Sequence, residues 1–279
     1  MLVVLLAILV ALILIFCGDR GAKSIVTTAI HAGILIVAIF CMYRGLPPVL
    51  VTAGACLMIS AVTMFYQNDG DLKSRIAFGS VVIVILVLIP VVFWFAGAAN
   101  AEGFNSEQYE ITDTNGYTRN IDMNMLQLQI SVMLIALIGT VIDIAIAITS
   151  SIYEIYESVG GQPDGEVALG VDGQLGGESF DVGNAGGGAR LTYGQLLSTG
   201  FTASRAILNT SIHTIFYIYI AEYLTLMIQY VNEYDFARLI NSQSFAAEFI
   251  SISISGIGCC LVVPVATMLT AWVLGRGDR

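Results

Sequence analysis

Charged residues are scarce in this chain. They make up 11% of its 279 residues, and hydrophobic residues make up 57%. Soluble domains normally carry about 25% charged residues. So little charge cannot cover the surface of a water-soluble domain of this length. The composition therefore excludes that class and indicates a membrane protein with several spans.

Basic residues, cysteines and catalytic motifs are also limited. The chain has 11 Lys and Arg against 21 Asp and Glu, a formal net charge of −10, so we expect no nucleic-acid partner. Its five cysteines lie in or at the end of apolar runs without CxxC spacing, so we expect no disulfide, metal cluster or other cofactor. HExxH, a GxSxG elbow and a P-loop are missing, so we expect no enzyme.

Long apolar runs dominate the chain instead. A helix needs about 20 mostly apolar residues to cross a bilayer. Seven runs approach or exceed that length: residues 2–17, 25–43, 49–66, 76–97, 126–150, 203–230 and 249–274. We therefore predict an all-α fold, a polytopic transmembrane helix bundle of about seven spans.

The distribution of Lys and Arg sets the expected orientation. With the N-terminus outside and the C-terminus cytoplasmic, three basic residues lie outside: Arg44, Arg119 and Arg238. Eight then lie on the cytoplasmic side: Arg20, Lys23, Lys73, Arg75, Arg190, Arg205, Arg276 and Arg279. This bias follows the positive-inside rule.

Changes in composition divide the chain into five segments. We expect a four-helix membrane bundle, an acidic outer loop, a long polar-faced helix, a flexible glycine-rich cytoplasmic loop and the C-terminal membrane helices, over residues 1–97, 98–124, 125–158, 159–191 and 192–279. Short turns at Gly18–Ser24, Arg44–Pro48 and Gln67–Arg75 join the first four spans. We expect Thr192–Gly200 to lie along the membrane surface as an amphipathic lead-in.

Asp143 is the most informative residue. It is the only charge between residues 126 and 150, and an ionisable group inside a membrane is costly and usually functional. At 100° per residue it shares a small, polar helix face with Ala136, Gly139, Thr140, Ala147, Ser150 and Glu154. We expect this face to be buried against protein. The opposite side, rich in isoleucine, would then face lipid or tight apolar packing.

The next span offers a matching polar row. Arg205, Asn209 and His213 follow at intervals of four residues, so they share one helix face. Counting at about 1.5 Å per residue places Asp143 and His213 at nearly the same depth. Glu154 and Arg205 both lie near the cytoplasmic end.

The polar groups have two interpretations, and their spacing does not decide between them. In one, Asp143 and His213 bind or relay a cation or proton, because an intramembrane acid beside a group that titrates near neutrality suits a relay. Asn209, Thr140 and Ser150 complete that site. In the other, the polar groups only hold helices together. Under either, Glu154 and Arg205 form an inner gate or a structural ion pair.

His31 lies in the second predicted span, one turn after Thr27 and Thr28 and beside small residues. We interpret it as a hydrogen-bonded residue between helices rather than as a ligand.

Several short segments resemble the YibE/F family of bacterial multi-pass membrane proteins. The central one runs from Gly139-x-x-x-Asp143 to Ser150-x-x-Tyr153-Glu154. The others are Gly18-Asp19-Arg20-Gly21 with Lys23, Arg44-Gly45-Leu46, Ser198-Thr199-Gly200 with Arg205 and Thr210, and Ser255-Gly256-Ile257-Gly258 with Val263-Pro264. The chain departs from the family pattern at Ala206, at His213 and in the glycine-rich segment, which resembles an insertion.

The resemblance implies a permease-like protein of the bacterial cytoplasmic membrane, similar to the shorter, YibF-like subunit. We therefore expect a transporter or channel subunit for a small ion or solute. The alternative is a non-transporting scaffold or assembly partner of a paralogous subunit. Expected partners are membrane lipid and either further copies of the chain or a YibE-like subunit.

Overall fold

The computed structural model describes residues 1–68, 70–98, 125–160, 193–233 and 243–276. Within these ranges the chain forms helices and no strand, which confirms the predicted all-α class. The elements are α1 (Leu2–Tyr43), α2 (Pro48–Ala61), the π-helical segment η1 (Val62–Gln67), α3 (Leu72–Ala98), α5 (Met125–Gly160), α6 (Tyr193–Glu233) and α8 (Gln243–Arg276). The predicted acidic loop and glycine-rich loop fall almost wholly outside the described residues.

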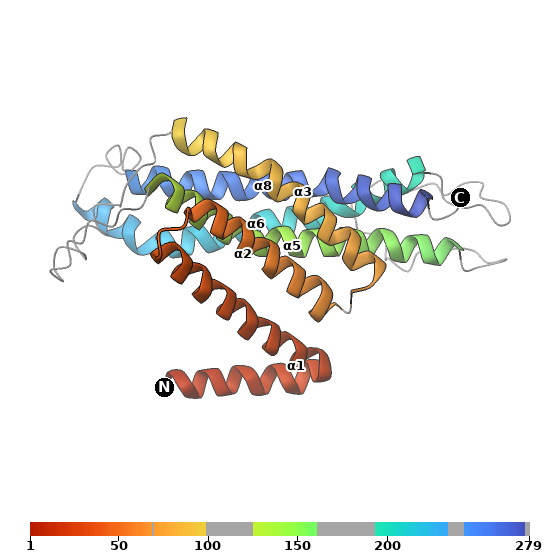
Figure 1. The fold of residues 1–279 in the computed structure, drawn as a ribbon, viewed down its shortest axis with the longest axis horizontal. Helices are drawn as coiled ribbons and strands as arrows, with labels where there is room; N and C mark the ends of the chain where they lie inside the picture. Colours follow the sequence, from red (N-terminus) through yellow and green to blue (C-terminus); the bar gives the residue numbers. More distant parts are fainter. Residues whose placement is uncertain (69, 99–124, 161–192, 234–242, 277–279) are drawn as a thin grey trace.

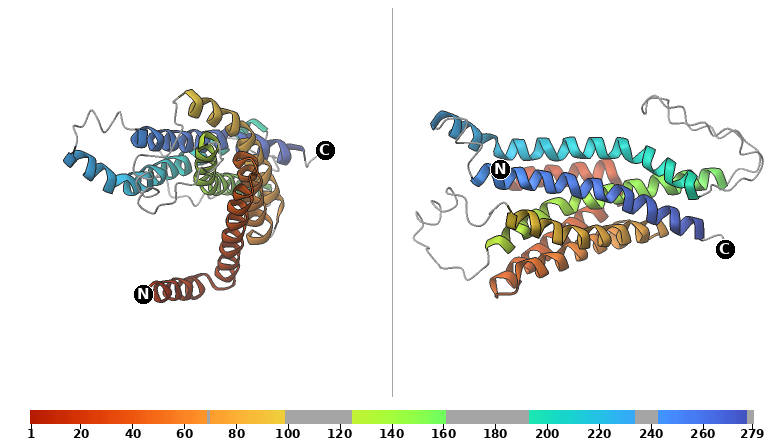
Figure 2. Two further views of the ribbon diagram at one scale, coloured as in Figure 1. Left: turned by 60° about the vertical axis from the view of Figure 1, so that its left-hand side comes forward. Right: turned by 90° about the horizontal axis from the view of Figure 1, so that it is seen from above.

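α5, α6 and α8 run side by side along the long axis of the molecule, and α2 and α3 pack against them at an angle (Figures 1 and 2). Five described segments are long and apolar enough to cross a membrane: Val3–Tyr43, Pro48–Gln67, Leu72–Phe95, Gln127–Glu157 and Phe249–Gly275. α6 is not among these five segments. It nevertheless lies alongside α5 and α8, two of the spanning candidates.

The predicted turn at Gly18–Ser24 is wrong, because α1 runs through this segment with a kink. Only Gly18 departs from helical geometry, with φ 54° and ψ −131°, and the helix continues from Asp19. A side chain disfavours this backbone conformation, so glycine allows the kink. The kink divides α1 into two arms that run in opposite senses along the long axis of the molecule and at a clear angle to one another. The N-terminal arm stands apart from the other helices (Figures 1 and 2).

The structure confirms the predicted turn at Arg44–Pro48, with glycine and proline at its key positions. α1 ends at Tyr43, Gly45 adopts φ 87°, and Pro48 is the first residue of α2. Proline suits the first helical position because its missing N–H would have no partner there. The next predicted turn, at Gln67–Arg75, begins where η1 ends.

The predicted surface lead-in is also corrected. From Tyr193 onward its residues form the first turns of the continuous helix α6, and Leu196 is buried. The reason lies at Gly200, where a Cβ would lie 2.5 Å from Thr267 Cγ2 and 2.7 Å from Ile152 Cδ1. Because glycine has no Cβ, α6 approaches α8 and α5 closely at this point.

Candidate functional site

α5 presents its polar face outward, contrary to the prediction. Val141, Ile144 and Ile148 on the isoleucine side are at most 1% exposed, and that side packs against α2, α3 and α8. Gly139 and Asp143 on the polar side are exposed. The prediction failed because lipid tails are as apolar as a protein core, so an isoleucine stripe fits either environment.

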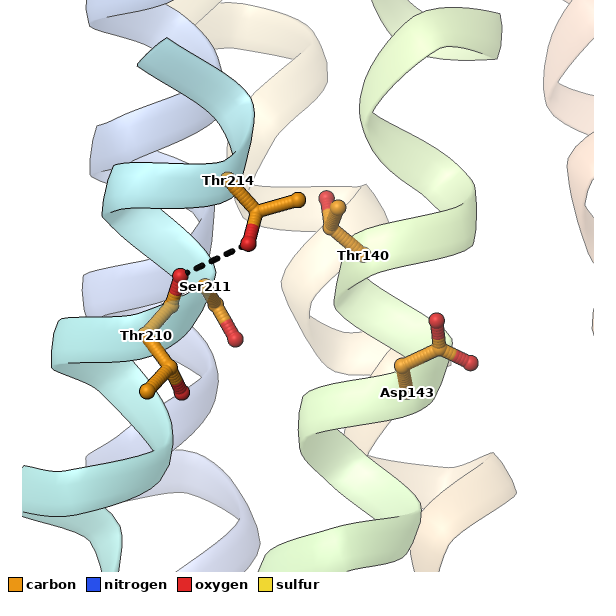
Figure 3. Close-up of a pocket in the computed structure, with 5 residues that line it drawn as sticks. All are labelled: Thr140, Asp143, Thr210, Ser211 and Thr214. Atoms are coloured by element: carbon orange, nitrogen blue, oxygen red, sulfur yellow. Dashed lines mark hydrogen bonds between the residues drawn. The ribbon is translucent and has the colours of Figure 1, made fainter. Parts of the chain in front are cut away.

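A cavity of about 210 Å³ lies between the polar side of α5 and α6. Its lining residues come from both helices: Thr140 and Asp143 on α5, and Thr210, Ser211 and Thr214 on α6 (Figure 3). Asp143 is one residue past the midpoint of the apolar segment Gln127–Glu157. If that segment crosses the bilayer, the cavity lies near mid-depth.

The three threonine hydroxyls of the cavity use their protons within their own helices. Each donates to a backbone carbonyl at 2.8 to 2.9 Å: Thr140 to Leu137, Thr210 to Ile207 and Thr214 to Thr210. A hydroxyl that donates its proton keeps lone pairs for accepting. The threonines therefore offer the cavity acceptor oxygens.

The Asp143 carboxylate has no hydrogen-bond or ion-pair partner among the residues that the structure describes. A carboxylate and several hydroxyl oxygens therefore surround the cavity. Oxygen acceptors of this kind suit a proton donor or a hard cation rather than an anion or a soft metal. Within the described ranges, no three His, Cys, Asp or Glu side chains gather as a metal site.

The structure places the other predicted site residues as follows. Asn209 and His213 are exposed and lie outside the described cavity lining, each one residue before a lining threonine. One residue is 100° of rotation, which turns both away from the gap between α5 and α6. Ser150 is half-buried, two turns from Asp143 toward the C-terminal end of α5.

Glu154 and Arg205 are both exposed, and no salt bridge joins them in the described chain. Their depths differ as well. Thr140 lies level with Thr214 in Figure 3, and Ile152 meets α6 at Gly200. This antiparallel register places Arg205 about six residues from the level of Glu154, or ~9 Å along the axis.

Sequence reasoning missed Thr210, Ser211 and Thr214 as the α6 side of the site. Thr210 and Thr214 are four residues apart, a spacing that predicts a shared helix face. The neighbouring row of Arg205, Asn209 and His213 has the same spacing and stronger polarity. The sequence therefore pointed to the more polar row, which does not line the cavity, rather than to the adjacent threonines, which do.

Other polar side chains make contacts between helices of the bundle. The His31 Nε2 atom lies 3.2 Å from the Thr63 hydroxyl of η1, which confirms the predicted hydrogen bond between helices. The buried Thr270 hydroxyl lies 3.5 Å from that of Thr149, linking α8 to α5. By contrast, the buried Thr267 hydroxyl has no partner in the described chain.

These features define a multi-pass helical membrane protein with a polar cavity beside Asp143. The chain belongs to the YibE/F-like protein family, which matches residues 5–160 and 188–276. The intervening residues fall in the glycine-rich segment, as expected for an insertion. No curated protein and no solved structure matches the chain.

Proposed function

We propose that the protein is a transporter or channel subunit that binds a small cation or a proton at Asp143. The unpaired carboxylate on a cavity at mid-span carries this proposal. A charged side chain at the bilayer centre costs about 2.5–3.5 kcal/mol on insertion scales. A bound cation or proton would offset that cost.

The lining of the cavity supports a cationic substrate. Thr140, Thr210 and Thr214 direct their protons to carbonyls, so they add acceptor oxygens around the carboxylate. Ser211 adds a fourth hydroxyl. From Asp143, Ser150 and Glu154 continue the polar face toward the C-terminal end of α5, which is the proposed inner half of the path.

The proposed topology has seven crossings of the bacterial cytoplasmic membrane. The two arms of α1 count separately because the Gly18 kink reverses the direction of the helix. α6 counts because it lies along α5 and α8. An odd number of crossings places the two termini on opposite sides, with the N-terminus outside by the distribution of basic residues.

Cation movement in liposomes tests the function. The purified chain is reconstituted, and Na⁺, K⁺ and H⁺ fluxes are followed with ion-sensitive dyes under an imposed gradient. Asp143→Asn keeps the shape of the side chain but removes its charge, so we expect loss of flux with unchanged size-exclusion behaviour. Asp19→Asn is the matched control, because Asp19 is exposed and lies outside the cavity lining. No flux in the wild type, or equal flux in Asp143→Asn, would overturn the proposal.

The alternative, a non-transporting scaffold, draws on the same exposed polar side of α5. A surface of this kind suits contact with another membrane protein as well as with an ion. The liposome assay separates the two functions, because a scaffold remains electrically silent in every variant.

A further inference from the structure

Polar residues of α5 and α6 share an exposed surface that none of the described residues covers. We define it as the α5–α6 face, formed by Gly139, Asp143, Asn209 and His213. His213 lies on the open flank of α6, since Ile215, which is 100° beyond Thr214 on the other flank, is 5% exposed and packs into the bundle. The face therefore carries an acid on one helix and an imidazole and an amide on the other.

Lipid is a poor cover for this face. Asp143 is close to the midpoint of its span, where a charged side chain costs about 2.5–3.5 kcal/mol even on the lower scales. Polar and ionisable side chains at such depth normally face other helices or a water-filled cavity. The cavity beside Asp143 gives the face some polar surroundings, but Asn209 and His213 lie outside its described lining.

We propose that a second copy of this chain covers the α5–α6 face, in a dimer with its two-fold axis along the membrane normal. Rotation about such an axis keeps every residue at its own depth. It places α5 of one protomer opposite α6 of the other. Asp143 then lies near the level of the partner copy's Thr210, within one turn of both its Asn209 and its His213 (Figure 3).

Charge complementarity favours a second copy over other occupants. Each face offers the carboxylate of Asp143 on α5 and the donors of Asn209 and His213 on α6. Two-fold symmetry brings each carboxylate opposite the donors of the other copy, so the interface contains this pairing twice. The same contact closes the open side of both cavities. The inference rests on exposure and depth, so it holds whether or not the protein transports an ion.

Site-specific crosslinking tests the dimer. The accessible Cys17, Cys41 and Cys260 are replaced by Ala, and the buried Cys56 and Cys259 are kept. Two differently tagged copies are coexpressed, one with Gly139→Cys and one with Tyr217→Cys, and are oxidised in isolated membranes. Gly139 has no atom within 4 Å of a Cβ position, and Tyr217 is 66% exposed one turn beyond His213.

Gly54→Cys paired with Tyr217→Cys is the matched control. Gly54 on α2 is also an exposed glycine with no atom within 4 Å of a Cβ position. We expect several-fold more crosslinked dimer from the Gly139 pair than from the Gly54 pair. Equal yields would overturn the proposal and leave lipid or a different protein as the cover.

A charge swap tests the pairing across the interface. Asp143→His and His213→Asp should each lower the crosslinking yield several-fold, and the double variant should restore it, because the opposed groups are then exchanged. Recovery also shows that the loss is not misfolding. Single variants that leave the yield unchanged, or a double variant that stays low while eluting as a folded protein, would refute the pairing.

Discussion

Gly200 is where the structure predicts the largest effect of one added methyl group. In Gly200→Ala the new Cβ would lie 2.5 Å from Thr267 Cγ2 and 2.7 Å from Ile152 Cδ1, well inside ordinary contact distance. Thr267 and Ile152 are both fully buried, so neither has free space to move into. Overpacking of this kind costs about 1–3 kcal/mol. With two close contacts, we expect the cost to fall in the upper part of that range, ~2–3 kcal/mol.

Gly194→Ala on the same helix is the control, because its Cβ would meet no atom within 4 Å. Both substitutions gain about 1 kcal/mol of helix propensity, which cancels in the comparison. The difference of ~2–3 kcal/mol corresponds to roughly 4–12 °C in Tm at about 2–4 °C per kcal/mol. The melting temperature in detergent is read from a thiol-reactive dye that labels the buried Cys56 and Cys259 on unfolding. Equal Tm values would show that α6 does not approach α5 and α8 this closely.

Three further experiments test the described geometry. Gly18→Ala should destabilise by about 1–3 kcal/mol, since the backbone conformation of Gly18 disfavours a side chain; a melting temperature equal to wild type would mean that the kink is not kept. Thr267→Val should be neutral or stabilising by up to about 1 kcal/mol because it removes a buried hydroxyl without a described partner, and a clear loss of stability would reveal a hidden hydrogen bond. A double-mutant cycle of His31→Phe and Thr63→Val should give a coupling near 0.6 kcal/mol, typical of hydrogen bonds between membrane helices; zero coupling would contradict the contact.

The sequence was a good guide to the helices because apolar length and proline are local signals. The predicted turn at Arg44–Pro48 ends where α2 begins, at Pro48, and the predicted run at residues 126–150 lies inside α5. Polar residues misled the prediction where tertiary contacts override them. The gap between the apolar runs 2–17 and 25–43 suggested a turn at Gly18–Ser24, yet only Gly18 leaves the helix.

The sequence predicts the acidic residue of the candidate site but not the residues that surround it. Asp143 is identified by its isolation among apolar residues. The facing side of α6 depends on a rotation of 100°, the difference between His213 and Thr214, and periodicity alone does not fix that angle. Which side of α5 faces protein was equally undetermined, because membrane lipid and a packed interior select the same side chains.

The bend at Gly18 has a consequence for the compartment in which the chain starts. A straight helix of 42 residues would measure about 63 Å, roughly twice the ~30 Å hydrocarbon thickness of a bilayer. In the proposed seven-crossing topology, the bend divides one overlong helix into two spans and so changes whether the number of crossings is odd or even. One glycine thereby determines the compartment that a reporter enzyme fused ahead of Met1 would occupy.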